Sequence, residues 1–551
     1  MSVNHSEFSN LIWSVCDDEL RGLFKPHEYG SVILPFIVLR RLDCVLEPHK
    51  DKIHNLYEKY KDKLDDLSPI IKKSVNLPFY NTSNYDLSRL KSDPQNVMTN
   101  FNNYLNGFSE NVEDIIKNFD LRKYVEKLNE RNRLYQLIDK FTEIDLHPNK
   151  VSNHEMGTVY EELLRRFSEM SNEESGDHYT PRDVVELLVS VLFEGDKEEL
   201  QGKGKIRSVY DCCCGTGGML TEGKNTILNQ INPDLKINLY GQELNPITYA
   251  ICKSDFLILG EDPENIKGPK SSLSEDQFEG EKFEYMIVNP PFGESWSTEK
   301  EYIVNESKDP NGRFSIGLPW VKDGSFLFLQ HLLKKMDVRS KIGIIFGGSC
   351  CFTGKPGSGE SNNRKHLISN DMVECIIRLP KKLFFNTPLT TYIWIISNHK
   401  KPERRGNIQL IDSSNNYYRR NRPLGKKFHV IGEKDRLLTL EKYISSVEDE
   451  FSRFIPNDEF GFQQVEVNNG ERKILTRIPL HIDPQKFLDE NKDKFPKNSV
   501  IQKNKVKVGY EVIFNKYFYN YVPPNSLESY TNKIKELDQN IDQLKRNLID
   551  V

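Results

Sequence analysis

The sequence predicts an α/β fold with a doubly wound, mostly parallel sheet, an all-helical N-terminal domain and a C-terminal helical tail. Three observations lead to this prediction. Between about residue 180 and residue 415, apolar strand-like runs alternate with amphipathic helix-like runs. A glycine-rich loop follows the first strand-like run of the sheet. The residues before about 150 show helix-like apolar spacing without that alternation.

The strands expected for the sheet are short, apolar runs that end in polar or turn residues. They are Ile206–Asp211, Ile237–Glu243, Tyr285–Val288, Ile342–Phe346, Val373–Leu379 and Thr391–Ser397. The helices expected between them are Asp183–Phe193, Gly218–Gln230, Ile247–Leu259 and Phe326–Met336. Sheets of this kind bind ligands outside the carboxyl ends of their strands, so we expect a site at that edge.

The chain divides into three expected parts. Residues 1–150 form a helical N-terminal domain, in which the stretch 60–115 is polar and predicts shorter helices. Residues 151–480 form the α/β domain. Residues 481–551 form a C-terminal extension that holds an aromatic stretch and a final helix.

The last expected helix carries apolar residues at alternating three- and four-residue steps. They are Ile534, Leu537, Ile541, Leu544 and Leu548. This spacing is typical of a heptad seam of about two repeats. Two heptads are too few to stand alone, so the helix is expected to pack either on its own domain or on a partner.

Composition narrows the class of protein. The chain has 551 residues, of which 37% are hydrophobic and 28% charged, and its formal net charge is −5. We expect a globular protein without a membrane span or a secretory signal. Nine scattered cysteines favour a reducing cytoplasm over a disulfide framework. The acidic balance indicates that, if nucleic acid is the substrate, a partner supplies much of the affinity.

The first motif is the glycine-rich loop, which follows an expected strand and opens a helix. It contains Asp211, Gly215, Thr216, Gly217 and Gly218. Glycine permits tight turning and close approach of a ligand to the backbone. No Lys-Ser or Lys-Thr pair follows, so a phosphate-cradling P-loop is not expected.

The next expected strand ends in Glu243, about 26 residues beyond the glycine turn. A carboxylate at this place can accept hydrogen bonds from both ribose hydroxyls of a nucleoside-bearing cofactor. A surface glutamate at a strand end is the alternative interpretation.

A third segment precedes the helix expected from Asp183. It consists of Asp177, His178, Tyr179, Thr180, Pro181 and Arg182. Thr180 can cap the helix and Pro181 suits its first turn, so helix-start chemistry alone explains this pair. The aromatic Tyr179 and the place of the segment, just before the glycine-loop strand, favour a wall of the ligand pocket.

The fourth motif, Asn289-Pro290-Pro291-Phe292, ends a buried strand. Proline donates no backbone N–H and fixes its own φ, so this strand end offers rigid carbonyl oxygens beside one amide and one aromatic face. Two acceptors can hold the hydrogens of an NH2 group while the ring stacks on a flat face. The motif therefore predicts a socket for a planar amine such as a nucleobase.

The adjacent cysteines Cys212, Cys213 and Cys214 predict no metal site. Successive residues at a strand end point to alternating sides, and the sequence offers neither a CxxC pair nor a nearby histidine. Small buried residues are the expected interpretation.

These motifs, in this order on a doubly wound sheet, resemble the S-adenosylmethionine-dependent amino-methyltransferases. The residues Asp211–Gly218 look like the cofactor loop of that class, and 289–292 looks like its catalytic motif. Two departures stand out. Cys212 and Cys213 replace a proline and a small residue, and Ser271 stands where a polar residue beside the cofactor's adenine is expected.

Further segments resemble the modification subunit of type I restriction-modification systems over nearly the whole chain. They are Asp18–Gly22 with Leu39–Leu42, Met156–Phe167, His178–Arg182, Arg378–Pro380 with Leu383–Pro388, Val508–Glu511 and Tyr521–Pro524. The α/β domain is then the methyltransferase catalytic domain.

The resemblance implies transfer of a methyl group from S-adenosylmethionine to N6 of a flipped adenine in double-stranded DNA. The Asn289 side-chain oxygen and the Pro290 carbonyl would accept both amine hydrogens, and Phe292 would stack on the base. Methylation of a glutamine amide or an RNA base is the alternative reaction, because similar sockets serve both. A non-catalytic scaffold that binds the cofactor is the alternative from another class.

The resemblance also implies partners. A separate specificity subunit would choose the DNA sequence, with two modification subunits for each specificity subunit, and a restriction subunit would join the full complex. The final helix would then dock on the specificity subunit.

Overall fold

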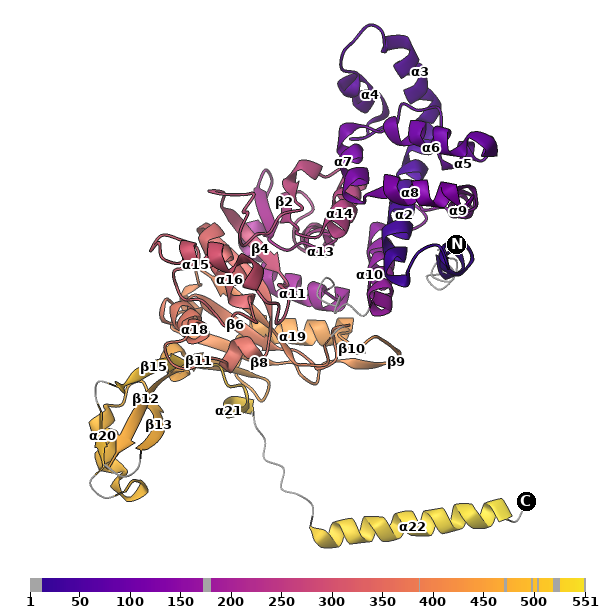
Figure 1. Ribbon diagram of the computed structural model, residues 1–551. Coiled ribbons are helices and arrows are strands. Elements are labelled where there is room, and N and C mark those ends of the chain that lie inside the picture. The colour runs from indigo at the N-terminus through magenta and orange to yellow at the C-terminus, as the bar shows by residue number, and fades with distance from the viewer. Residues whose placement is uncertain are drawn as a thin grey trace. The chain divides into compact units, whose positions relative to one another are not determined.

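The computed structural model describes residues 12–171, 180–385, 387–469, 473–496, 499–502, 505–518 and 526–549. The chain forms two compact units, Met1–Val512 and Ile513–Val551. Figure 1 shows helices at the N-terminal end of the first unit, a central sheet, and a smaller sheet near its C-terminal end. No helix in the described part of the chain combines the length and the apolar character needed to cross a bilayer.

The N-terminal helices surround one apolar helix, α2. The principal helices are α2 (Tyr29–Leu46), α3 (Lys50–Tyr60), α4 (Ser68–Val75), α5 (Leu87–Leu90), α6 (Val97–Asn106), α7 (Glu110–Asn118), α8 (Leu121–Glu130), α9 (Leu134–Thr142) and α10 (Asn153–Ser171). Nearly every residue of α2 is buried. Its fully buried Arg41 donates to the carbonyl oxygens of Leu146 and Val151, at 2.9 and 3.0 Å. A buried guanidinium needs such partners, so Arg41 fixes the segment that leads into α10.

The central sheet has nine strands in the order β11-β8-β6-β7-β5-β4-β1-β2-β3. They are β1 (Ile206–Asp211), β2 (Lys236–Gln242), β3 (Ile266–Lys267), β4 (Phe283–Val288), β5 (Met336–Gly347), β6 (Val373–Arg378), β7 (Thr391–Ser397), β8 (Asn407–Asp412) and β11 (Ser452–Pro456). Strand β7 runs antiparallel to both β5 and β6, and β11 runs antiparallel to β8, while the other pairs are parallel. The chain moves outward from β1 to β3 and returns to β4 on the other side of β1. The gap between β1 and β4 is therefore a switch point, where such sheets bind ligands.

The helices of the sheet region agree with the alternation in the sequence. They are α11 (Arg182–Glu194), α12 (Lys197–Leu200), α13 (Gly218–Thr226), α14 (Pro246–Leu259), α15 (Lys300–Glu306), α16 (Ser325–Lys335), α17 (Ser349–Phe352), α18 (Gly359–Ser369) and α19 (Glu433–Ser445). Asn245 starts α14, since its side chain accepts the N–H groups of Ile247 and Thr248. The expected helix Gly218–Gln230 ends earlier, because its last turn widens into a π-helix over Ile227–Ile231. The predicted fold class is confirmed.

The helical core extends beyond residue 150. Met156, Tyr160 and Phe167 of α10 lie in the same apolar cluster as α2. The cluster also includes Ala250, Ile251 and Leu257 of α14, and Lys253 of that helix pairs with Asp114 of α7 at 2.8 Å. The helical core and the sheet region therefore share α14.

A smaller antiparallel sheet lies on both sides of residue 480. Its strands are β12 (Gly461–Asn468), β13 (Lys473–Pro479), β14 (Val500–Ile501) and β15 (Lys507–Tyr510), with α20 (Pro484–Glu490) between β13 and β14. Separately, β9 (Tyr418–Leu424) and β10 (Lys427–Val430) form a hairpin. The second unit contains α21 (Asn515–Phe518) and α22 (Leu527–Ile549), and Ile534, Leu537 and Ile541 of α22 are exposed.

Candidate functional site

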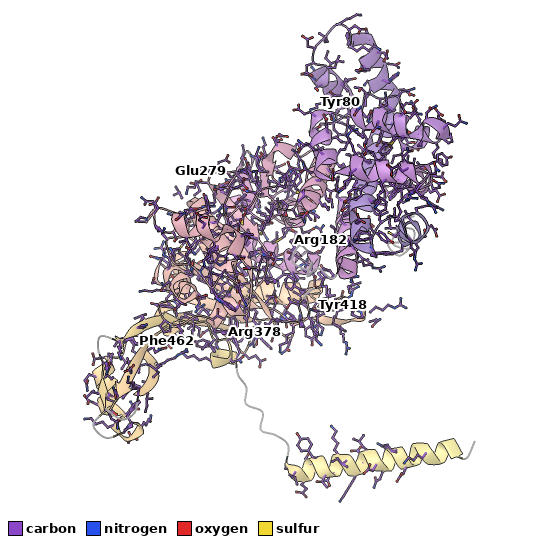
Figure 2. The ribbon with its side chains drawn as sticks, in the orientation of Figure 1. Tyr80, Arg182, Glu279, Arg378, Tyr418 and Phe462 are labelled. Atoms are coloured by element: carbon purple, nitrogen blue, oxygen red, sulfur yellow. The ribbon has the colours of Figure 1, made fainter. Side chains whose placement is uncertain are left out.

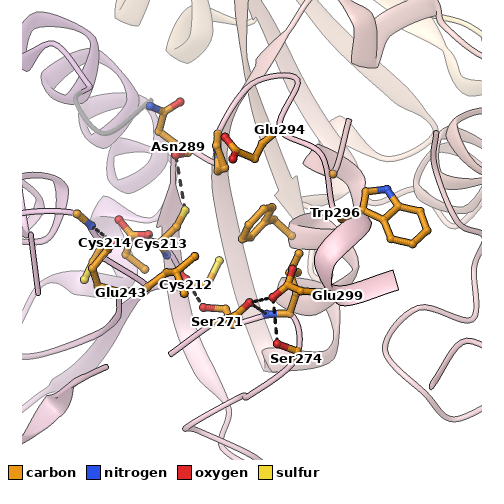
Figure 3. A pocket seen from close by; sticks show the side chains of 18 of the residues that line it. Cys212, Cys213, Cys214, Glu243, Ser271, Ser274, Asn289, Glu294, Trp296 and Glu299 are labelled. Atoms are coloured by element: carbon orange, nitrogen blue, oxygen red, sulfur yellow. Dashed lines mark hydrogen bonds between the residues drawn. The ribbon is translucent and has the colours of Figure 1, made fainter. Parts of the chain in front are cut away.

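A cavity of about 430 Å³ opens at the carboxyl ends of β1, β2 and β4. Asp211, Glu243 and Asn289, which end or follow these strands, all line it, as do Gly215 and Thr216 of the glycine loop. Figure 3 shows the three cysteines Cys212–Cys214 beside Glu243, with Asn289 at one end of the cavity. The topology thus brings together three motifs that lie far apart in the sequence.

The glycine loop has the backbone that its composition predicts. Gly215 and Gly217 have φ values of 55° and 80°, a region that favours glycine. A Cβ at Gly217 would lie 2.7 Å from Cys252 Sγ of α14. Gly217 is therefore needed both for the turn and for close packing on α14, while Gly215, Thr216 and Gly218 line the cavity.

Glu243 is held by the loop that it faces. Its Oε2 accepts the N–H of Gly215 at 2.8 Å, and its Oε1 accepts the N–H of Asn245 at 2.7 Å. The carboxylate is buried, and each of its oxygens retains a lone pair beyond the backbone hydrogen bond. A diol in the cavity can therefore donate to Glu243 without displacing the backbone.

Asp211 shares the cavity with Glu243. Burial raises the pKa of its carboxyl to about 7; the N–H of Cys213, which donates to it at 3.0 Å, works against this shift, and the nearby Glu243 adds to it. A positively charged ligand would favour the ionised form of this carboxyl.

Asn289 presents an unpaired acceptor. Its Oδ1 is buried, and no described residue donates a hydrogen bond to it. Buried amide oxygens are normally satisfied, so an unpaired one beside a cavity indicates a missing partner. The backbone carbonyl of the same residue faces the Cys213 thiol, with Sγ and O 3.6 Å apart (Figure 3).

The rest of this motif separates two cavities. Pro290 is buried and Pro291 lines the first cavity, whereas Phe292 lines a second cavity of about 1180 Å³. Phe292 meets Phe384 edge to face, with ring centroids 5.6 Å apart. Glu294 and Ser295 line both cavities, so the motif and the loop after it form a shared wall.

Of the segment before α11, residues 177–181, only Thr180 is described as lining the first cavity. Asp177, His178 and Tyr179 lie outside the described residues. Thr180 lines the cavity and its hydroxyl donates to Met219 Sδ at 3.5 Å. Pro181 precedes the first residue of α11 and does not line the cavity.

Arg182 lies behind the glycine loop and does not line the cavity. Its Nη1 donates to the carbonyl of Gly218 at 3.2 Å, and a Cβ at Gly157 of α10 would lie 2.0 Å from its Nη2. Figure 2 shows Arg182 between the N-terminal helices and the sheet region. The sequence predicts that Arg182 lies at the cofactor, whereas in the structure it contacts the glycine loop from the side away from the cavity.

The structure adds residues that the motifs do not contain. Trp296, Thr298 and Glu299, which follow the motif of residues 289–292, line the cavity together with Ser271 and Ser274. Figure 3 shows Glu299 and Ser274 at the end of the cavity opposite Asn289. The family resemblance marked Ser271 in the sequence, but nothing marked Glu299, because it belongs to no recognised pattern.

Comparisons with known proteins match most of the chain to two family models. The N-6 DNA Methylase family model matches residues 151–468, and the HsdM N-terminal domain model matches residues 8–141. The type I restriction enzyme MjaIX methylase subunit of Methanocaldococcus jannaschii is 25% identical over 489 residues, covering 85% of this chain and 81% of that protein. The HindI methylase subunit of Haemophilus influenzae is 30% identical over 269 residues, covering 49% and 56%.

Solved structures agree in fold. The type I restriction-modification system methyltransferase subunit of Streptococcus thermophilus superposes with a TM-score of 0.65 at 21% identity, covering 83% of this chain and 97% of that chain. The family models and the curated relatives confirm the resemblance stated from the sequence. Because its model spans more than half of the residues, the chain belongs to the N-6 DNA Methylase family, in the form that carries an HsdM N-terminal domain.

Proposed function

We propose that this protein transfers the methyl group of S-adenosylmethionine to N6 of adenine in double-stranded DNA, as the modification subunit of a type I restriction-modification complex. The observation that carries the proposal is the buried, unpaired Oδ1 of Asn289 on the wall between the two cavities. An amine held there would have a methyl donor on one side and its own base on the other.

The first cavity fits the cofactor. Its volume falls in the range of about 300–1,000 Å³ typical of small-molecule sites. Asp211, Glu243, Glu275, Glu294 and Glu299 line it, and none of its described lining residues is a lysine or an arginine. This charge suits a ligand with a sulfonium and an ammonium group, and Glu243 retains lone pairs for the ribose hydroxyls. When bound, S-adenosylmethionine supplies an electrophilic methyl group.

The protein's own contribution is positioning. Asn289 Oδ1 and the Pro290 carbonyl accept the two hydrogens of the adenine amine, which turns the nitrogen lone pair away from conjugation with the ring. Held in this way, the amine would direct its lone pair at the methyl group that the bound cofactor would supply, and the surplus proton of the methylated nitrogen would pass to solvent. Orientation and charge stabilisation do most of the work, so the motif needs no general base before attack.

The second cavity suits the flipped base and its duplex. Phe292 and Phe385 offer aromatic faces, and the lining contains Lys322 and Lys426 beside acidic residues. The β9–β10 hairpin carries further positive charge, because Arg419 and Arg422 are exposed on β9. Lys426, in the turn of this hairpin, lines the second cavity. Tyr418 of the same hairpin projects from the edge of the sheet region (Figure 2).

We further propose the partners of this chain, which the family and an exposed surface support. A specificity subunit chooses the DNA sequence, two modification subunits serve each specificity subunit, and a restriction subunit joins the full complex. The exposed Ile534, Leu537 and Ile541 of α22 supply an apolar seam that suits docking on the specificity subunit. Within this proposal residues 1–150 are the helical domain, 151–480 the catalytic domain and 481–551 the docking extension, in a cytoplasmic protein.

The test is Asn289→Ala in a complex with a co-expressed specificity subunit. Incorporation of labelled methyl groups into unmodified genomic DNA is expected to vanish, with N6-methyladenine measured in the digest. Cofactor binding, measured by calorimetry, is expected to persist, because Asn289 does not hold the nucleoside. Substantial methylation by the Ala variant would refute the assigned role of Asn289.

A further inference from the structure

The end of the first cavity opposite Asn289 is a small polar cluster. The hydroxyl of Ser271 donates to Oε1 of Glu299, and the hydroxyl of Ser274 donates to the same oxygen at 3.0 Å (Figure 3). The N–H of Leu273 donates to Ser271 Oγ at 3.2 Å, and the Ser272 hydroxyl donates to the Cys212 carbonyl. These bonds tie the segment after β3 to the glycine loop on one side and to Glu299 on the other.

Within this cluster, Glu299 has one oxygen engaged and one available. Both serines donate to Oε1, and no described residue donates to Oε2. Among the residues described, no lysine or arginine nitrogen lies within salt-bridge distance of this carboxylate, whereas Glu275 in the same wall pairs with Lys270. Glu299 therefore brings an oriented acceptor without a cationic partner to the cavity.

The surroundings of Glu299 suit a flat ring. Leu273 and Trp296 are buried and line the cavity, and Phe328 adds a second aromatic side chain. Apolar walls with a few convergent polar groups are the usual form of a site that orients a heterocycle. The acceptor thus lies at the edge of an apolar slot.

The order of groups along the cavity decides which part of the cofactor lies in this slot. The methyl group must reach Asn289, and the ribose hydroxyls are placed on Glu243. The base lies on the far side of the ribose from the sulfonium, so it points toward Ser271 and Glu299 (Figure 3).

We propose that Glu299 recognises the exocyclic amine of the cofactor's adenine, with Oε2 accepting an amine hydrogen, while Ser271 and Ser274 are positioning residues that orient the carboxylate. The proposal rests on the proposed function, from which it takes the adenine nucleoside, the methyl group at Asn289 and the ribose hydroxyls on Glu243. Glu299 then supplies the polar contact for which the sequence offers only Ser271.

Hydrogen-bond chemistry gives a sharp consequence. A carboxylate only accepts, so it matches the amine of adenine and opposes the carbonyl oxygen of hypoxanthine. In Glu299→Gln, an amide oxygen at the Oε1 place keeps both serine hydroxyls as donors and leaves the NH2 group at the Oε2 place. That variant would donate a hydrogen bond to the carbonyl of hypoxanthine and oppose the amine of adenine. The site should therefore prefer hypoxanthine to adenine, the reverse of the wild-type preference.

The experiment measures binding of S-adenosylhomocysteine and S-inosylhomocysteine to the full chain by calorimetry. The wild-type protein is expected to bind the adenosyl ligand at least about tenfold more tightly, as sites that pair a polar edge reject its mismatch strongly. Glu299→Gln is expected to weaken the adenosyl ligand and strengthen the inosyl ligand. Glu301→Gln, on an exposed residue of α15 two positions away, is the matched control and should leave both affinities unchanged.

The outcomes separate the two proposals. Equal weakening of both ligands by Glu299→Gln, or no change in their ratio, would overturn the role of Glu299 while leaving the cofactor assignment intact. Failure of the wild-type protein to bind either ligand would overturn the cofactor assignment and this inference together. Thermal unfolding of each variant checks that a loss of binding is not a loss of folding.

Discussion

The guanidinium of Arg182 occupies the space beside Gly157, where a Cβ would lie 2.0 Å from Nη2. Gly157 belongs to α10, which packs in the helical core, while Arg182 starts α11 and supports the carbonyl of Gly218. Because Gly157 has no side chain, α10 leaves room for Arg182, which donates a hydrogen bond to the glycine loop.

Replacing Gly157 with alanine should therefore weaken cofactor binding, although Gly157 is no part of the cavity lining. The new methyl group displaces the guanidinium of Arg182, and the Gly218 carbonyl then keeps the Thr221 hydroxyl as a donor but loses Arg182. We expect the affinity for S-adenosylhomocysteine, measured by calorimetry, to fall several-fold. In a double-mutant cycle with Arg182→Ala, the two effects should be strongly non-additive; simple additivity would mean that Gly157 acts through other contacts.

Cofactor binding should strengthen as the pH rises through about 7. The Asp211 carboxyl, whose pKa burial raises to about 7, is largely neutral below that pH in the free protein. A cationic ligand favours the ionised carboxylate, so binding at lower pH carries the added cost of releasing a proton. Affinity should fall by up to about tenfold per pH unit below 7 and level off above it.

Measurement of the dissociation constant of S-adenosylmethionine between about pH 5.5 and pH 8.5 checks this dependence. Asp211→Asn cannot ionise, so its affinity should be weaker and nearly flat over the same range. A slope that survives in Asp211→Asn would assign the titration to another group.

The arginines of the β9–β10 hairpin should contribute to DNA affinity. The triple variant Arg419→Ala, Arg420→Ala and Arg422→Ala removes three positive charges from β9, the strand that leads to Lys426 in the lining of the second cavity. In the complex with the specificity subunit, DNA binding should weaken. The dependence of log affinity on log salt should lessen by about one unit for each phosphate that the variant no longer neutralises. Cofactor affinity should remain unchanged.

A matched control removes the same charge elsewhere. Lys59→Ala, Lys61→Ala and Lys63→Ala alter three exposed lysines in and just after α3, so net charge changes equally. Fluorescence anisotropy with labelled duplexes compares the two triple variants. Equal weakening by both would show that net charge, and not the hairpin, governs the affinity.

Removing residues 526–551 should prevent stable assembly with the specificity subunit. The deletion takes away α22 with its exposed seam of Ile534, Leu537 and Ile541, and these side chains gain stability only by burial against another surface. Co-purification with a tagged specificity subunit is the measurement. Undiminished co-purification would place the docking surface elsewhere, while calorimetry with cofactor serves as the control for folding.

Much of the fold is present in local patterns of the sequence. The strands ending at Asp211 and Val288 lie where the apolar runs end, and the motif residues Asp211, Glu243 and Asn289 meet because parallel strands bring their carboxyl ends to one edge. The small sheet was not predicted, because β14 and β15 are two and four residues long and gain their pairing from distant β12.

Parts of the site depend on tertiary contacts that carry no local signal. Glu299 gains its place from the hydroxyls of Ser271 and Ser274, which approach from the segment after another strand. The residues before Arg182 in the sequence suggest that it forms a wall of the pocket. The absence of a side chain at Gly157 instead leaves room for its guanidinium behind the glycine loop. Neither relationship follows from spacing or composition.

Helix α14 belongs to two cores at once, with Ala250, Ile251 and Leu257 in the helical cluster and Cys252 and Phe256 in the sheet cluster. A recombination event that joins the first half of one homologue to the second half of another must therefore match both faces of a single helix. A chimaera that exchanges only the N-terminal helices packs them against α14 residues of the other homologue. A chimaera that also exchanges the α14 residues that contact those helices keeps the native packing. The ancestry of the two regions is thus physically linked, and they are expected to diverge together.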